Sequence, residues 1–140
     1  MLQTTLLHPG ILSALGRAGH GSQVLIADGN YPFSTGSPDS AEKVFLNLMP
    51  GMVKVTDVLE ALVDTIPIET AAVMVPDDQA DQPIFSEFRK ILPRDLKLMK
   101  ITRFAFYDRA RSTDTALVIA TGEQRIYANI LLTIGVRTSH

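Results

Sequence analysis

A histidine and an aspartate stand at the two ends of a short apolar run near the start of the chain. His20 lies between Gly19 and Gly21, and Asp28 directly follows the apolar residues 24–27. An imidazole titrates near neutral pH, so His20 could act as a general acid or base. Asp28 could orient an imidazole or accept hydrogen bonds from hydroxyl groups. The structural alternatives are a turn histidine bonded to a backbone carbonyl and an aspartate that builds an Asp-Gly turn.

The apolar run sets the distance between these two groups. It is continuous, which is typical of a strand covered on both faces. Because an extended strand rises about 3.3 Å per residue, His20 and Asp28 are expected at opposite ends of one strand. They can share one small site only if the chain bends back or if another subunit supplies the second group.

Two further pairs of polar side chains are spaced for carbohydrate binding. Arg103 and Tyr107 are four residues apart, so they share a face if their segment is helical. Tyr127 and Asn129 flank Ala128, and they point the same way in an extended chain. Guanidinium and amide groups can bind vicinal hydroxyls, and a tyrosine ring can cover a sugar face. The alternative is a surface arginine with a half-buried tyrosine.

Alternating strands and helices are predicted to position these residues. Apolar periodicity and the placement of Pro and Gly predict helices over residues 9–16, 56–66, 84–91 and 103–110, with Thr56 as an N-cap. The predicted strands cover residues 24–27, 43–48, 71–75, 96–102, 116–120 and 130–134. The fold class is α/β: a single layered domain over residues 1–140, with a mixed, largely parallel sheet flanked by helices.

Composition narrows the class of protein. A chain of 140 residues, 46% hydrophobic and 20% charged, fits one globular domain with a buried core. The net charge of −2 gives no electrostatic reason to expect nucleic acid. Without cysteine there is no disulfide, zinc–thiolate site or cysteine nucleophile. No signal peptide and no apolar stretch of about 18 residues is present, so we expect a soluble, cytoplasmic protein without membrane contact.

Common cofactor and catalytic motifs are missing. No phosphate-binding loop of the Walker type occurs, and the glycines around His20 lack the strand-then-helix context of a dinucleotide fingerprint. His8, His20 and His140 show no metal-ligand spacing. There is no G-x-S-x-G nucleophile motif. The sequence therefore predicts neither a metal nor a cofactor.

The residues with candidate chemistry fall within the pattern of a known family. The chain resembles the D-ribose pyranase and L-fucose mutarotase family over nearly its whole length. The stretches that carry the resemblance, in order, are HPGILSALGRAGHG, ADGNYP, VTDVLEAL, RFAFYDRA and TGEQRIYANILLTIGV. The resemblance implies a cofactor-free isomerase, a mutarotase that interconverts the α and β anomers of a pyranose. In ribose-type members it implies exchange between pyranose and furanose forms.

The resemblance also implies a role for each candidate residue. The proposed proton donor of the family falls on His20. Its substrate-binding positions fall on Asp28, Arg103, Tyr107, Tyr127, Ala128 and Asn129. Fucose-type members carry arginine at the position of Arg103, where ribose-type members tend to carry histidine, so the fucose branch is favoured.

Several alternatives stay open at this point. The chain could be a D-ribose pyranase, or a non-catalytic sugar-binding module associated with sugar transport. The second proton of the reaction could pass through Tyr127, a bound water or the substrate itself. Family members form rings, decamers among them, with sites at subunit interfaces. The resemblance therefore implies a homo-oligomer whose small-molecule partner is a monosaccharide, L-fucose or a similar pyranose.

Overall fold

The computed structural model of the chain describes residues 1–139, and His140 lies outside them. Six strands form one sheet in the order β2-β5-β1-β6-β3-β4. Their bounds are β1 (Gln23–Ala27), β2 (Glu42–Phe45), β3 (Ile68–Val75), β4 (Leu98–Thr102), β5 (Thr115–Ala120) and β6 (Ile130–Ile134). The helices are α1 (Pro9–Arg17), α2 (Val55–Val63), α3 (Pro83–Ile91) and α4 (Arg103–Ala110). This confirms the predicted α/β class and its mixed sheet.

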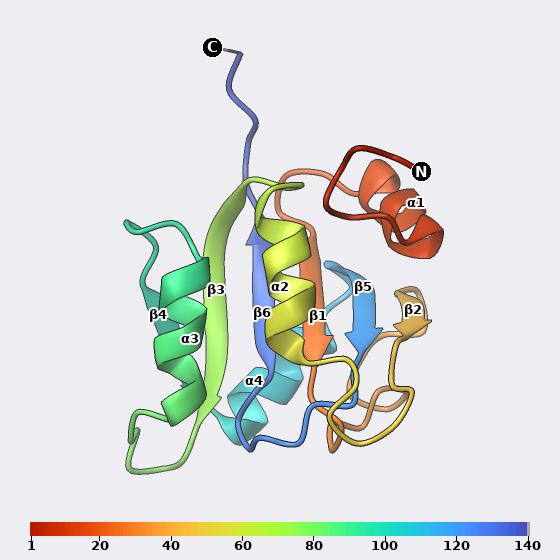
Figure 1. Ribbon diagram of the computed structural model, residues 1–140. Helices are drawn as coiled ribbons and strands as arrows, with labels where there is room; N and C mark the ends of the chain where they lie inside the picture. Colours follow the sequence, from red (N-terminus) through yellow and green to blue (C-terminus); the bar gives the residue numbers. More distant parts are fainter. Residues whose placement is uncertain (140) are drawn as a thin grey trace.

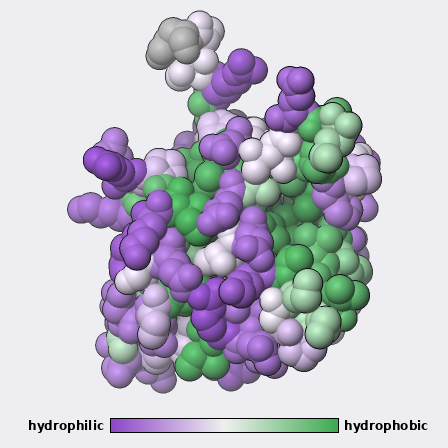
Figure 2. All heavy atoms as spheres, in the orientation of Figure 1, coloured by the Kyte–Doolittle hydropathy of each residue, from purple (hydrophilic) through white to green (hydrophobic). Residues whose placement is uncertain are grey.

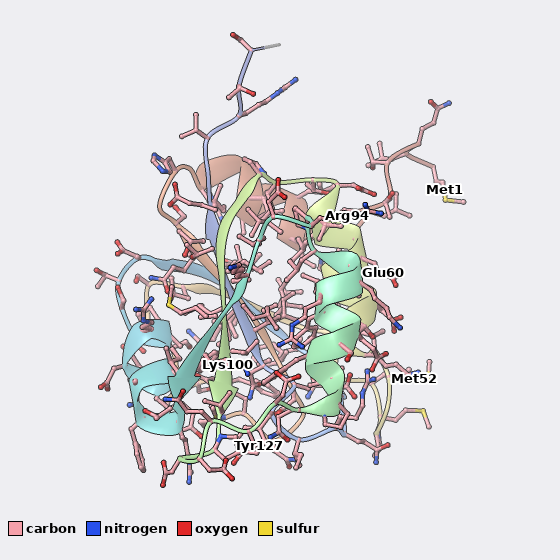
Figure 3. All side chains as sticks on the ribbon, turned by 90° about the vertical axis from the view of Figure 1, so that its left-hand side faces the viewer. Met1, Met52, Glu60, Arg94, Lys100 and Tyr127 are labelled. Carbon is pink, nitrogen blue, oxygen red and sulfur yellow. The ribbon has the colours of Figure 1, made fainter. Side chains whose placement is uncertain are left out.

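Helices cover both faces of the sheet (Figures 1 and 3). Side chains of α1, α2 and α3 pack with Val24 and Ile26 in the larger apolar cluster. Leu25 and Ala27 point to the other face, where they join Phe106 of α4. Successive residues of β1 thus enter two different cores, which explains why residues 24–27 are all apolar.

The direction of β6 determines what meets at each end of the sheet. β1 runs parallel to β5, β5 parallel to β2, and β3 parallel to β4. β6 lies between β1 and β3 and is antiparallel to both. The carboxyl ends of the five parallel strands and the amino end of β6 therefore share one edge, the carboxyl edge of the sheet. Ligands of open α/β sheets bind at such edges.

Most of the predicted helices and strands differ from the observed ones by one to three residues at an end, and two of these differences have a clear physical cause. The helix expected to start at Thr56 begins at Val55, because the Asp57 carboxylate accepts the Lys54 backbone N–H at 3.1 Å. The Thr56 cap was therefore wrong, and Thr56 lies within the first turn. β2 ends at Phe45 instead of residue 48, since the chain then enters a tight turn in which Gly51 has a φ of +83°.

Apolar side chains are exposed at the end of β2 and on the segment that follows it. Phe45, Leu48, Met49 and Met52 are between 47% and 76% exposed. Figure 2 shows apolar surface on the right-hand side of the molecule, where β2 and this segment lie. Within residues 1–139, no helix combines the length and the apolar composition needed to span a membrane.

Candidate functional site

A pocket of about 410 Å³ opens at the carboxyl edge of the sheet, beside α4 and the segment between β5 and β6. It gathers five of the residues predicted to bind substrate, although they come from distant parts of the chain. Its lining is Asp28, Asn30, Tyr31, Met74, Arg103, Tyr107, Ile126, Tyr127 and Asn129. Figure 3 shows Tyr127 at this end of the molecule, near the end of α4 at the lower left. Donors, acceptors and aromatic rings thus converge on one cavity, as sugar binding requires.

Asp28 and Asn129 form the buried floor of this arrangement. Asp28 is 5% exposed, and its backbone N–H donates to Asn129 Oδ1 at 2.7 Å. Its carboxylate accepts the Asn30 N–H at 3.0 Å. Burial raises the pKa of Asp28, while hydrogen bonds from the backbone of Asn30, Tyr31 and Ala128 act in the opposite direction. Because Asn129 Oδ1 is occupied, its NH₂ group is the part of the amide that can donate to a ligand.

Ala128 acts through its backbone. Its side chain is fully buried, and its N–H helps to hold the Asp28 carboxylate. Ala128, which was predicted to bind substrate, therefore supports the site through its backbone, and its side chain does not line the cavity.

Arg103 and Tyr107 face each other across one turn of α4, as their spacing predicts. Arg103 Nε donates to the Tyr107 hydroxyl at 3.3 Å. The guanidinium carbon lies 5.4 Å from the centroids of both the Tyr107 and Phe104 rings. The Tyr107 ring in turn meets the Tyr31 ring edge-on, at 5.5 Å between centroids. The cation is therefore held against aromatic faces with part of its donor fork left for a ligand.

Tyr127 reaches the pocket differently from the sequence-based expectation. We expected Tyr127 and Asn129 on one face of an extended chain, but residues 126–127 form a turn and Tyr127 has a φ of 56°. Both side chains line the pocket all the same. The left-handed conformation is costly for a residue with a Cβ atom, so the surrounding contacts must hold it.

His20 lies at the other end of β1, away from this pocket. Its Nε2 is 3.0 Å from Glu69 Oε1 at the start of β3, and the two side chains are 56% and 49% exposed. Gly21 has a φ of +88°, a conformation that glycine adopts without strain. Within one chain, His20 and Asp28 are therefore separated by a strand, as their sequence spacing predicted. Glu69 was not predicted, because nothing in the sequence marks a carboxylate 49 residues away.

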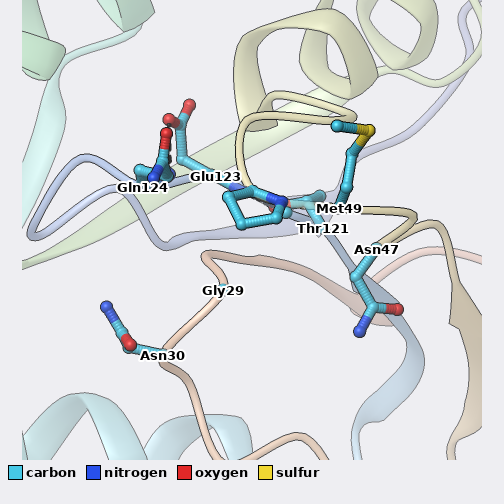
Figure 4. Close-up of a pocket in the computed structure, with 9 residues that line it drawn as sticks. Gly29, Asn30, Asn47, Met49, Thr121, Glu123 and Gln124 are labelled. Carbon is cyan, nitrogen blue, oxygen red and sulfur yellow. Dashed lines mark hydrogen bonds between the residues drawn. The ribbon is translucent and has the colours of Figure 1, made fainter.

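A second hollow, of about 430 Å³, lies next to the first at the same edge of the sheet. It is lined by Gly29, Asn30, Asn47, Met49, Pro50, Thr121, Gly122, Glu123 and Gln124 (Figure 4). Asn30 is common to both pockets. The sequence did not predict this hollow, since its lining comes from three separate segments of the chain.

Comparisons with known proteins find relatives that match nearly the whole chain. The fucose mutarotase of Homo sapiens is 35% identical, over 94% of this chain and 90% of the relative. A D-ribose pyranase of Clostridium perfringens is 28% identical, over 97% of this chain and 98% of the relative.

Solved structures share the whole architecture. The structure of Bacillus subtilis RbsD complexed with D-ribose has a TM-score of 0.84 at 24% identity, covering 99% of this chain and 100% of that chain. The fucose mutarotase of Streptococcus pneumoniae in complex with L-fucose has a TM-score of 0.82 at 23% identity, with the same coverage. Residues 1–137 match the model of the RbsD / FucU transport protein family, and the chain belongs to that family.

Proposed function

We propose that this protein is a sugar mutarotase, an isomerase that interconverts the α and β anomers of a pyranose such as L-fucose. The observation that carries the proposal is the pocket in which Asp28, Arg103, Tyr107, Tyr127 and Asn129 converge at the carboxyl edge. The human fucose mutarotase, 35% identical over most of both chains, supports the same activity.

Anomer exchange requires two proton transfers and no change of oxidation state. A proton is delivered to the ring oxygen and another leaves the anomeric hydroxyl, so that the bond between C1 and the ring oxygen breaks and an aldehyde forms. Rotation about the C1–C2 bond and the reverse steps close the ring as the other anomer. In our proposal His20 is the acid, and Asp28, Asn129 and Arg103 hold the remaining hydroxyls in place.

The lining supports L-fucose over D-ribose as the substrate. A fucopyranose carries a methyl group on C5, and Met74 and Ile126 give the pocket apolar side chains that can contact it. Arg103 is also the residue that the fucose branch carries at this position. The D-ribose pyranase relative keeps pyranose–furanose exchange of D-ribose as the second candidate.

A non-catalytic sugar-binding module is the candidate from a different class. It would use the same pocket, and the family description includes transport. In either case we place the protein in the cytoplasm, and cell fractionation with immunoblotting tests this location. The enzyme and the binding module differ in one property, which is acceleration of anomer exchange.

The separation of His20 from the pocket supports a homo-oligomer with sites at subunit interfaces, such as a decameric ring. Glu69 lies against the imidazole at 3.0 Å and can orient it toward a neighbouring copy. The exposed apolar residues Phe45, Leu48 and Met52 offer surface that a second copy can bury. We propose that His20 of one subunit completes the pocket of another.

Saturation-transfer NMR between the two anomeric proton signals tests the activity. A panel of L-fucose, D-ribose and galactose-like pyranoses should show the largest acceleration for L-fucose. His20→Ala should return the exchange rate to that of buffer, while the control His8→Asn, which changes a histidine outside the site, retains it. If the wild-type protein binds sugar without accelerating exchange, the binding module is the correct function.

Mixing two inactive variants tests the shared site. His20→Ala keeps an intact pocket, and Asn129→Ala keeps an intact His20. After subunit exchange in an equimolar mixture, roughly a quarter of the interfaces combine an intact pocket with an intact histidine, so about that fraction of activity should return. A mixture that stays inactive, although mass spectrometry detects mixed oligomers, would contradict an interface site.

A further inference from the structure

The segment between β5 and β6, residues 121–129, is fastened by one buried carboxylate. Glu123 is 3% exposed, and its Oε1 accepts the Val55 N–H at the start of α2 at 3.3 Å. Its Oε2 accepts the backbone N–H groups of Gln124 at 3.0 Å and Arg125 at 3.3 Å. Figure 4 shows the Glu123 side chain directed away from Asn30. The carboxylate thus ties this segment, which carries Tyr127 and Asn129, to the core of the fold.

Arg125 binds the same carboxylate with both branches of its fork. Its Nε donates to Glu123 Oε2 at 3.1 Å, and its Nη2 donates to Glu123 Oε1 at 2.7 Å. Its Nη1 donates to Glu87 of α3, and its Nη2 lies 3.5 Å from Thr56 Oγ1 in α2. One guanidinium therefore links the segment to both helices. Burial raises the pKa of Glu123, but the hydrogen bonds from Arg125 and Val55 and the charge of Arg125 together outweigh burial, so the pKa lies below its usual value.

Tyr127 lies two residues beyond this anchor and has the left-handed φ of 56°. On its other side, Asn129 is fixed by the hydrogen bond from the Asp28 N–H. A tyrosine relaxes to negative φ unless both flanks are held, because its Cβ atom disfavours the left-handed region. Such a relaxation would move the ring away from the pocket that it lines.

We propose that Arg125 is a positioning residue for the sugar pocket: its bridge between Glu123 and Glu87 holds residues 121–129 so that Tyr127 stays in the left-handed conformation. Only the kinetic test of this proposal rests on the proposed mutarotase function. Arg125 does not line the pocket, so it acts on sugar binding through Tyr127.

Arg125→Gln removes the charge and the fork, and Arg125→Lys keeps the charge without the fork. We expect Arg125→Gln to raise the KM for sugar about three- to tenfold while kcat changes less than about twofold, with Arg125→Lys between it and the wild type. The matched control is Arg89→Gln. Arg89 lies on the same helix as Glu87, and its substitution breaks an exposed ion pair of two hydrogen bonds with Asp81. This change should leave KM unchanged. If Arg125→Gln does not fold, Glu87→Gln removes only the outer half of the bridge and should raise KM by a smaller factor.

A double-mutant cycle separates positioning from a purely structural role. In a Tyr127→Ala background, Arg125→Gln should raise KM no further, because the ring it positions is gone. An equal factor in both backgrounds would refute the proposal, as would a wild-type KM in both Arg125→Gln and Glu87→Gln.

The conformation of Tyr127 can be measured without any activity. A residue with positive φ has a short distance between its amide and α protons, so the wild type should give a strong intraresidue NOE for Tyr127. Arg125→Gln should weaken it, and Arg89→Gln should not. A wild-type NOE in Arg125→Gln would overturn the inference even if the protein is a mutarotase, and a weakened NOE would support it even if no sugar is exchanged.

Discussion

Replacing Glu123 by glutamine probes the buried carboxylate that anchors the site. Glu123 accepts five hydrogen bonds, three from backbone N–H groups and two from the Arg125 guanidinium. A glutamine has one carbonyl oxygen, and its NH₂ group faces donors, so at least two donors lose their acceptor. At about 1 kcal/mol for each, plus the lost charge-assisted pair, Glu123→Gln should destabilise the fold by about 3 kcal/mol. The pair adds only modestly because the Arg125 side chain is 37% exposed.

The expected shift in Tm follows from the size of the chain. Unfolding entropy is about 2.1 cal/mol/K per residue, which gives about 0.3 kcal/mol/K for this domain and a fall in Tm of about 10 °C. Thermal unfolding should be followed by circular dichroism at pH 7 and one fixed protein concentration, since oligomerisation shifts Tm. Asp81→Asn, which breaks the exposed pair with Arg89, is the control and should lower Tm less.

The pH dependence gives the sharper test. The folded-state pKa of Glu123 lies below its usual value of 4.5, so its stabilising contribution is complete above about pH 4.5 and is lost as pH falls through the lowered pKa. Other carboxylates weaken both proteins in acid, but the difference between wild type and Glu123→Gln should shrink below pH 4.5. A difference that stays constant from pH 7 to pH 3.5, or one below 1 kcal/mol at pH 7, would refute this reasoning.

Three further changes probe other parts of the structure. Gly122→Ala places a Cβ atom on the carbonyl oxygens of Met49 and Met52, so it should cost about 3 kcal/mol or more and reduce the yield of folded protein; an unchanged urea midpoint would contradict this. His8→Ala removes an imidazole that accepts two N–H groups at the start of α1 and should cost about 1 kcal/mol by urea denaturation, whereas His8→Asn should cost less. Burial raises the pKa of Asp28 above 3.8, so its ionised form weakens the fold as pH rises through the raised pKa. Asp28→Asn should therefore gain in Tm relative to wild type between pH 4 and pH 7 while losing sugar binding, and a pH-independent difference would contradict the assignment.

Local patterns in the sequence predict the type and order of the helices and strands, but not all of their bounds. The helix over residues 103–110 and the strand over residues 130–134 have the predicted bounds, because apolar spacing and flanking polar residues are local signals. The Thr56 cap was wrong because a carboxylate from another residue, Asp57, satisfies the first N–H group of the turn. The apolar periodicity of a sequence does not show which of several neighbouring polar side chains will cap a helix.

The candidate site also has a part that the sequence predicts and a part that it does not. Asp28 and Arg103 directly follow strands, so their place at the carboxyl edge follows from strand direction once the sheet is known. Their roles in substrate binding, and the role of His20 as acid, stay predictions. The contacts of Glu69 and Glu123 were missed, since their partners include residues 49 and 68 positions away in the chain.

The antiparallel β6 strand explains why one chain holds only half of the proposed machinery. Its amino end pairs Ile130 with Ile26, which brings the preceding Asn129 against Asp28. Its carboxyl end lies beside the His20 turn, where Gly21 N–H donates to the carbonyl of Ile134 at 2.9 Å. β1 and β6 have five residues each, so the two ends are about 17 Å apart at about 3.4 Å per residue, whereas proton transfer needs about 3 Å. No side-chain rotation spans that distance, so the proposed roles of His20 and Asp28 are compatible only if the pocket of one subunit faces the histidine of another.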